Sequence, residues 1–154
     1  MNMKIIKVAD DEEKKKIARA ILEALPEWFG IVEAREEYIL DSVGKDFFRA
    51  MEKDTVVGFL YLKQTGKDTV ELAVMGVLKE YHHKGIGRAL FEYAKESIKE
   101  SGYSFIQVKT VKMGMYEDYD CTNRFYISLG FKEFEVIYTL WDENNPCQIY
   151  VMGI

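Results

Sequence analysis

The sequence predicts an α/β fold of the α+β kind, in which about four helices flank a mixed, mostly antiparallel sheet of about six or seven strands. Two observations carry this prediction. Strands separated by short polar turns, at 52–54 and 65–68, indicate an antiparallel meander in the first half of the chain. A stretch of helical periodicity at 87–101 then separates two strands, and a helical crossover makes such strands parallel.

The first half of the chain is expected to begin with a strand and two helices. Asp10 and Glu13 have the spacing of a capping box, and Pro26 ends the helix that follows them. An aromatic bend is expected at 28–30, before the second helix. The expected elements are a strand at 3–8, a helix ending before 26, a helix at 31–40, and strands at 47–51, 55–63 and 69–78.

The second half is expected to hold two helices and three strands. The helix at 87–101 stops at Gly102, because glycine favours the backbone conformation found after helix ends. A shorter helix is capped by Asp120 or Thr122 and ends at Leu129. The first helix should bury Ile86, Leu90, Tyr93, Ala94, Ser97 and Ile98, and strands are expected at 104–111, 131–140 and 147–152.

Length and composition restrict the class of protein. A chain of 154 residues is expected to form a single domain over 1–154. The formal net charge of -5 argues against a sequence-independent nucleic-acid binder and agrees with a cationic, amine-bearing substrate. No apolar run approaches the length of a membrane span. Cys121 and Cys147 are too few for a disulfide framework, and the first residues lack the apolar core of a signal peptide, so a cytoplasmic protein with reduced thiols is expected.

The candidate ligand site is a glycine-punctuated loop between a strand and a helix. Gly85 and Gly87 allow an anion to approach the backbone, and the amides at the helix N-terminus have no intrahelical partner. A dinucleotide fingerprint fails because position 90 is Leu, and a Walker A loop fails because Lys84 precedes the glycine. The loop therefore predicts a phosphate-bearing ligand of another kind.

Two segments carry a resemblance to a known family. Residues 77–90, with Lys84-Gly85-Ile86-Gly87-Arg88 at their centre, resemble the acetyl-CoA signature of the GCN5-related N-acetyltransferase (GNAT) family, whose usual form is Gln/Arg-x-x-Gly-x-Gly/Ala. Residues 122–131 resemble its second signature, a helix that carries a tyrosine and ends in Gly-Phe. The family's order of elements also matches. The chain departs from the pattern at His82, in the Gln/Arg position, and at His83, where glycine is common.

The resemblance implies a GNAT-like sheet with a splayed parallel central pair, and acetyl-CoA as cosubstrate. The loop amides would cradle the pyrophosphate, the Met75 amide would bind the acetyl carbonyl, and Val77 would pair with the pantetheine arm. Tyr126 would be the general acid for the leaving thiolate; the alternative is a core aromatic. The implied cofactor-binding residues are Met75, Gly76, Val77, His82, His83, Lys84, Gly85, Ile86, Gly87, Arg88 and Asn123.

Three residues leave alternatives open. Gly76 inside a strand indicates a bulge or a close backbone approach, or else relief of packing. Glu71 is a candidate general base; the alternatives are a solvated strand-end glutamate and a water chain that carries the proton. The histidine pair does not predict a metal site, because adjacent side chains diverge and no cysteine or carboxylate cluster supports them.

The sequence thus favours an enzyme that transfers acetyl from acetyl-CoA to a primary amine, of a small molecule rather than a macromolecule. The alternatives are a non-catalytic CoA-binding sensor and a protein N-terminal or lysine acetyltransferase. GNAT proteins often dimerise, so a homodimer is an open alternative. The candidate residues of the acceptor site are Trp28, Phe29, Tyr38, Tyr116 and Trp141.

Overall fold

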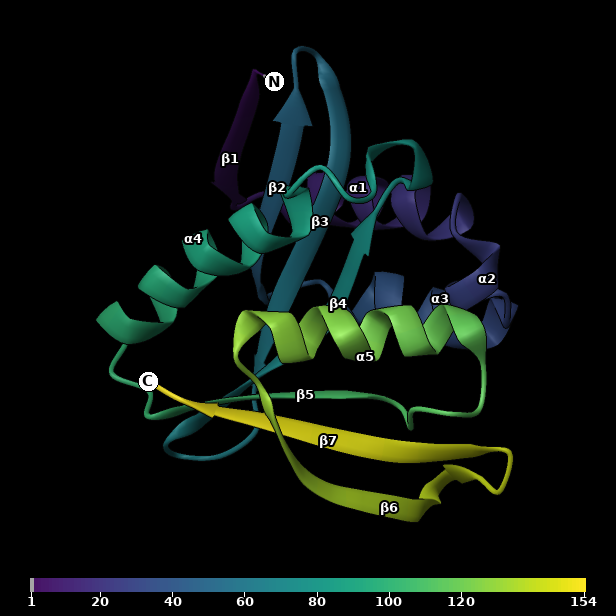
Figure 1. Cartoon of the computed structure of the whole chain (residues 1–154). Helices are drawn as coiled ribbons and strands as arrows, with labels where there is room; N and C mark the ends of the chain where they lie inside the picture. The colour runs from purple at the N-terminus through teal and green to yellow at the C-terminus, as the bar shows by residue number, and fades with distance from the viewer. Residues whose placement is uncertain (1) are drawn as a thin grey trace. The chain divides into compact units, whose positions relative to one another are not determined.

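The computed structural model describes residues 2–154, and its strands form a seven-stranded mixed sheet in the order β1-β2-β3-β4-β5-β7-β6 (Figure 1). The strands are β1 (Met3–Val8), β2 (Asp46–Glu52), β3 (Thr55–Gln64), β4 (Thr69–Val77), β5 (Phe105–Val111), β6 (Lys132–Asp142) and β7 (Asn145–Gly153). The helices are α1 (Asp11–Glu23), α2 (Pro26–Phe29), α3 (Val32–Asp41), α4 (Ile86–Glu100) and α5 (Glu117–Leu129), with a short 3₁₀ turn η1 (Lys79–Tyr81). The predicted fold class is confirmed, including the parallel pair, which is β4 and β5.

Packing divides the chain into two compact units. The first runs to Lys63 and includes Leu72–Ser101, and the second comprises Gln64–Glu71 and Gly102–Ile154. The expectation of one domain over 1–154 stays a prediction, since packing alone does not test independent folding. Both cysteines are free thiols, with Cys121 exposed and Cys147 buried.

The first unit has one face of its strands covered by α1, α2 and α3. Phe47 of β2 and Phe59 of β3 stack with their ring centroids 5.2 Å apart, and they belong to the core cluster that α1 completes with Ile17 and Ile21. The predicted cap of α1 is confirmed, because the Asp10 carboxylate accepts a hydrogen bond from the Glu13 amide at 3.0 Å. This apolar face fixes α1 against β4, the strand that leads to the glycine loop.

Helix α4 packs on strands of the first unit with its own apolar stripe. Leu90 lies near Gly58 of β3, and the Tyr93 ring contacts Phe48 of β2. The predicted burial of Tyr93 was wrong, because its side chain is 45% exposed, whereas Phe91 is fully buried. The stripe therefore lies toward Phe91, and Tyr93 borders it. The buried residues of the helix are Ile86, Leu90, Phe91, Ala94 and Ile98.

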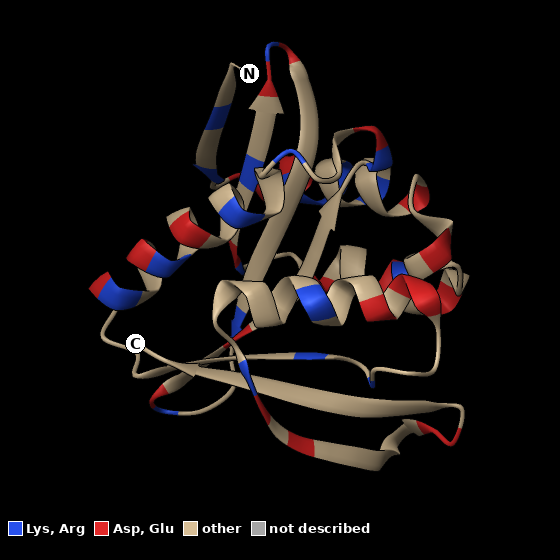
Figure 2. Ribbon diagram, in the orientation of Figure 1, with Lys and Arg blue, Asp and Glu red and all other residues tan. Residues whose placement is uncertain are grey.

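The second unit is an antiparallel arrangement of β5, β7 and β6 against which α5 packs. The pairs β5–β7 and β7–β6 have antiparallel register. The predicted start of α5 was wrong, since the helix begins at Glu117 after an extended Tyr116 that makes no capping bond. Asp120 lies inside the helix rather than at its cap, and its carboxylate accepts a hydrogen bond from the Gly114 amide in the preceding loop. The acidic first turn, red at one end of α5 in Figure 2, suits the positive end of the helix dipole.

The predicted aromatic bend at 28–30 is in fact the end of a short helix. Pro26 closes α1 and opens α2, where its missing amide would have had no intrahelical partner. The remaining boundaries lie within a few residues of those expected.

Candidate functional site

Strand β4 presents alternate residues to opposite faces along its whole length. Leu72, Val74 and Gly76 are buried, whereas Glu71, Ala73, Met75 and Val77 are only partly so, and the pattern is not reset near Gly76. The described pairing with β5 covers Thr69–Phe105, Val70–Ile106 and Glu71–Gln107, and β4 then continues to Val77. Met75 and Val77 therefore share the partly buried face.

Gly76 is required by packing against α1. A Cβ added there would lie 2.9 Å from Ile21 Cγ2 and 3.2 Å from Leu25 Cδ1, closer than carbon atoms approach without displacement. Its φ lies outside the left-handed range, so the backbone conformation itself does not demand glycine. The geometry favours the packing alternative for this residue, and its contact with a cofactor stays a prediction.

The glycine loop follows β4 through η1 and has left-handed backbone at two places. His83 has φ of 61°, and Gly85, the residue that caps α4, has φ of 81°. A left-handed residue other than glycine is strained, so the histidine at position 83 has a conformational cost. Nothing lies within 4 Å of a Cβ added at Gly85, so packing does not require glycine at this position. The left-handed backbone conformation does, and the space beside the loop is open.

The exposed residues 83–85 lie directly before the N-terminus of α4. The first intrahelical hydrogen bond of α4 runs from the Ala89 amide to the Gly85 carbonyl at 3.0 Å, so the Ile86 and Gly87 amides precede it. Lys84 is exposed and lies over the Tyr81 ring, with its ammonium 5.3 Å from the ring centroid. The segment leading into α4 and the first part of that helix are blue in Figure 2. Amides, helix dipole and basic side chains all favour an anion here.

His82 binds the protein's own backbone. Its Nε2 lies 2.6 Å from the Val77 carbonyl oxygen, and its ring meets Trp28 edge-on with centroids 5.8 Å apart. Because a carbonyl oxygen can only accept, Nε2 carries the hydrogen and donates it. The contact predicted between His82 and the cofactor stays a prediction.

Glu71 forms an ion pair that the sequence did not indicate. Its Oε1 lies 2.9 Å from the Lys109 ammonium, and the two side chains are 13% and 28% exposed. The alternative of a solvated strand-end glutamate was therefore wrong. Lys109 was missed because the pairing depends on strand register: Glu71 lies opposite Gln107 in the parallel pair, and Lys109 is the next residue of β5 on the same face.

Tyr126 is buried in the second unit, on α5. Its ring packs near Phe131 and Tyr150, with centroids 5.9 Å and 6.4 Å away. Burial, and then the negative charge of Glu71, raise the pKa of the Tyr126 hydroxyl above its ordinary value. The phenol therefore stays protonated at neutral pH, which a proton donor requires.

The Asn123 side chain is fully buried and bonded inside the second unit. Its Nδ2 donates to the Val111 carbonyl at 2.8 Å and to the Tyr119 carbonyl at 2.7 Å, and its Oδ1 accepts from the Tyr150 hydroxyl at 2.6 Å. These bonds tie α5 to β5 and β7. They give the amide a structural role, and its contact with a cofactor stays a prediction.

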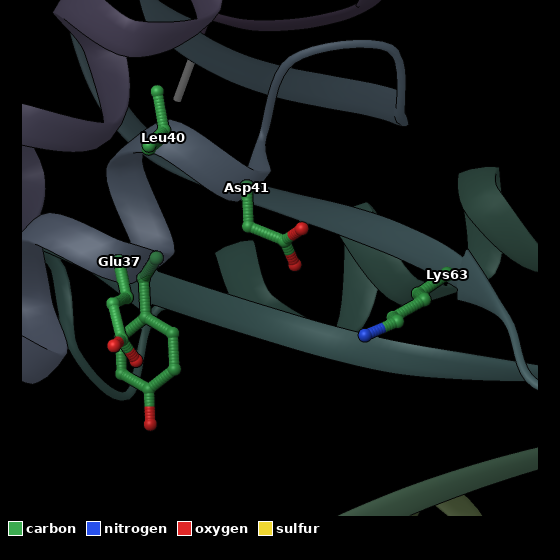
Figure 3. Close-up of a pocket in the computed structure, with 5 residues that line it drawn as sticks. Glu37, Leu40, Asp41 and Lys63 are labelled. Carbon is green, nitrogen blue, oxygen red and sulfur yellow. The ribbon is translucent and has the colours of Figure 1, made fainter.

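A separate open pocket of about 470 Å³ lies beside α3 in the first unit, lined by Glu37, Tyr38, Leu40, Asp41 and Lys63 (Figure 3). Of the aromatic residues expected at the acceptor site, only Tyr38 lines it. Two carboxylates and one ammonium line it, and Asp41 also pairs with Lys45 at 3.2 Å. These opposite charges give the pocket no clear preference for a cation or an anion.

The other aromatic candidates are divided between the two units. Trp28 and Phe29 are half-buried against the core of the first unit. Tyr116 and Trp141 belong to the second unit and are exposed, and the Tyr116 hydroxyl donates to the Asn144 carbonyl at 3.3 Å. Among residues 2–154, no group of three or more metal-ligating side chains comes together. Within the same residues, no helix is both long and apolar enough to cross a membrane.

The fold and the glycine loop at the start of α4 agree with one class of protein, the N-acetyltransferases. A family model described as an acetyltransferase (GNAT) domain matches residues 43–133. An uncharacterised N-acetyltransferase of Chlorobaculum tepidum is 30% identical over 114 residues, which cover 72% of this chain and 66% of that protein. This chain belongs to the GNAT acetyltransferase family.

Solved structures agree on the fold. A GNAT-family acetyltransferase of Desulfovibrio desulfuricans has a TM-score of 0.83 at 19% identity, and the match covers 98% of both chains. A GNAT-family acetyltransferase of Elizabethkingia anophelis, solved with acetyl-CoA bound, has a TM-score of 0.76 at 14% identity and 99% coverage of both chains. The predicted family is thereby confirmed by the family model and the curated relative, and the solved structures agree with its fold.

Proposed function

We propose that this protein transfers the acetyl group of acetyl-CoA to a primary amine of a small molecule. The observation that carries the proposal is the exposed loop at 83–85, which opens α4 and leaves the Ile86 and Gly87 amides ahead of the first helical bond. An open left-handed glycine and basic neighbours suit a pyrophosphate. Membership of the GNAT family supports acetyl-CoA as the molecule that carries it.

In the proposed reaction the neutral amine attacks the thioester carbonyl carbon. The C–S bond then breaks, and the thiolate takes a proton from the Tyr126 hydroxyl. The nitrogen gives up its remaining extra proton as the amide forms, and this proton returns through solvent to the Tyr126 oxygen. The Met75 amide is proposed to stabilise the oxyanion of the tetrahedral intermediate. The Tyr126 phenol is protonated at neutral pH, as a donor must be, although its raised pKa means that it gives up the proton less readily than an ordinary tyrosine.

Glu71 is proposed to take the proton that the attacking ammonium must lose, directly or through water. The Lys109 ammonium, 2.9 Å away, stabilises the ionised carboxylate and holds one of its oxygens in place. This contact fixes the position of the carboxylate. A water chain that bypasses Glu71 is the competing route.

Release of free thiol from acetyl-CoA, measured over polyamines, amino acids, aminoglycosides and peptides, tests the proposal. A small amine should release thiol fastest. Tyr126→Phe should lower kcat by about 10²–10³-fold with CoA affinity little changed. Full turnover of this variant under saturating substrate would remove Tyr126 as the acid.

Two alternatives have distinct outcomes in the same assay. CoA binding without thiol release for any amine would indicate a sensor, and release only with peptides would indicate a protein acetyltransferase. A homodimer and a cytoplasmic location stay predictions, and sedimentation of the purified chain tests the first.

A further inference from the structure

The His82 side chain is turned back toward the sheet. Its Nε2 donates to the Val77 carbonyl at 2.6 Å, at the last residue of β4, and its ring lies edge-on to Trp28 at an interplanar angle of 67°. The ring is half-buried, whereas the three residues that follow it, 83–85, are exposed. His82 therefore stands at the boundary between the packed strand and the open loop.

Other contacts also hold the start of the glycine loop in position. The His82 amide closes η1 by donating to the Lys79 carbonyl at 3.0 Å. Lys79 is also ion-paired with Glu27 of α2, next to Trp28. Both the main chain and the side chain of His82 thus fix the start of the loop to neighbouring elements of the first unit.

The loop needs such a support, because its conformation is not one that the chain adopts unaided. His83 and Gly85 are both left-handed, and nothing lies within 4 Å of the place of a Gly85 side chain. Strained backbone persists only where the surrounding structure determines it. A loop without support would have to be ordered by the ligand, which lowers affinity by the conformational entropy that is lost.

We propose that His82 is a positioning residue for acetyl-CoA, holding the loop against the end of β4 so that the amides at the start of α4 are oriented before the pyrophosphate binds. This rests on the proposed function. The side chain at the Gln/Arg position of the GNAT signature then acts through Val77 rather than on the phosphate. The same bond fixes the direction of the Val77 carbonyl at the end of β4.

Binding of CoA to wild type, His82→Gln and His82→Phe, measured by calorimetry, tests the proposal. His82→Phe keeps an aromatic ring beside Trp28 but has no donor, so the Kd should rise about 3- to 10-fold. His82→Gln retains an amide donor and should stay within about twofold of wild type. In steady-state assays the loss should fall on KM for acetyl-CoA, with kcat within about twofold. Amide exchange at 83–86 should be faster in free His82→Phe than in wild type.

Several outcomes would overturn the proposal. Equal losses in His82→Gln and His82→Phe would mean that the imidazole itself contacts the ligand. A fall in kcat at unchanged KM would indicate a part in the chemistry, and an unchanged Kd in His82→Phe would mean no part at all. If His82→Phe does not fold, as judged by urea unfolding, His82→Ala replaces it with the same expectations. A wild-type protein that does not bind CoA would instead refute the proposed function.

Discussion

Replacing Gly76 by alanine tests why the strand next to the glycine loop contains a glycine. The new Cβ would lie 2.9 Å from Ile21 Cγ2 and 3.2 Å from Leu25 Cδ1, and both of those side chains are buried. Overpacking of this kind costs about 1–3 kcal/mol. Alanine loses less conformational entropy than glycine on folding, which offsets about 0.5–1 kcal/mol. The expected net loss in unfolding free energy is about 1–2 kcal/mol.

Urea unfolding measures this loss, and two further variants make it specific. Gly66→Ala adds the same methyl where nothing lies within 4 Å and φ is not left-handed, so it should raise the free energy of unfolding by about 0.5–1 kcal/mol, the entropy gain alone. Ile21→Leu removes the Cγ2 methyl that the new Cβ would meet, so it should relieve part of the loss in the double variant.

The packing account fails if Gly76→Ala is as stable as wild type, or if Ile21→Leu gives no relief. A large loss of CoA affinity at unchanged stability would instead mean that Gly76 is needed for close approach of the cofactor.

The other predictions concern charge and backbone at the proposed site. Coulomb attraction between Glu71 and Lys109 at 2.9 Å is about 6 kcal/mol at an effective dielectric constant of about 20, and desolvation leaves a coupling of about 1–3 kcal/mol. A double-mutant cycle with Glu71→Gln and Lys109→Met measures this coupling by urea unfolding, and a coupling near zero would contradict the ion pair. In a separate test of catalysis, an unchanged acidic limb in the pH–rate profile of Glu71→Gln would remove Glu71 as the base. His83→Gly should change stability by less than about 0.5 kcal/mol because relief of strain offsets chain entropy, whereas His83→Val should cost about 1–2 kcal/mol, and equal stabilities would refute the strain. The pKa of Tyr126 is raised in the folded state. The contribution of the protonated phenol to the free energy of unfolding is therefore fully present below the ordinary pKa of 10.0 and is lost as pH rises above it. Above pH 10 wild type should therefore lose up to about 1.4 kcal/mol per pH unit more than Tyr126→Phe in urea unfolding, and parallel curves would show no burial effect on this pKa.

Features with local causes could be predicted from the sequence. The Asp10 cap and the glycine loop each depend on residues close together in the chain, and the structure has both. The parallel pair also followed from local patterns, because a helix between two strands leaves few other connections.

Features that depend on distant residues could not be predicted. The Glu71–Lys109 pair depends on which residues of β4 and β5 are neighbours, and alternation within one strand does not fix that register. Phe91 and Tyr93 lie on opposite borders of the apolar stripe of α4, and helical periodicity alone does not say which border the rest of the fold covers. The start of α5 was missed because Tyr116 makes no capping bond that a residue pattern would show.

The Asn123 amide has a consequence for mutational scanning. Its side chain supplies two donors and one acceptor to three separate partners, and no other side chain of similar size and shape offers that combination. Each group left unsatisfied by a substitution would cost about 1–3 kcal/mol. A library selected for activity should therefore reject nearly every change at this position, much as it would at a reacting group. Abundance of the folded variants, scored beside activity, separates the two cases: intolerance at Asn123 should be accompanied by loss of protein, and intolerance at Tyr126 by loss of turnover.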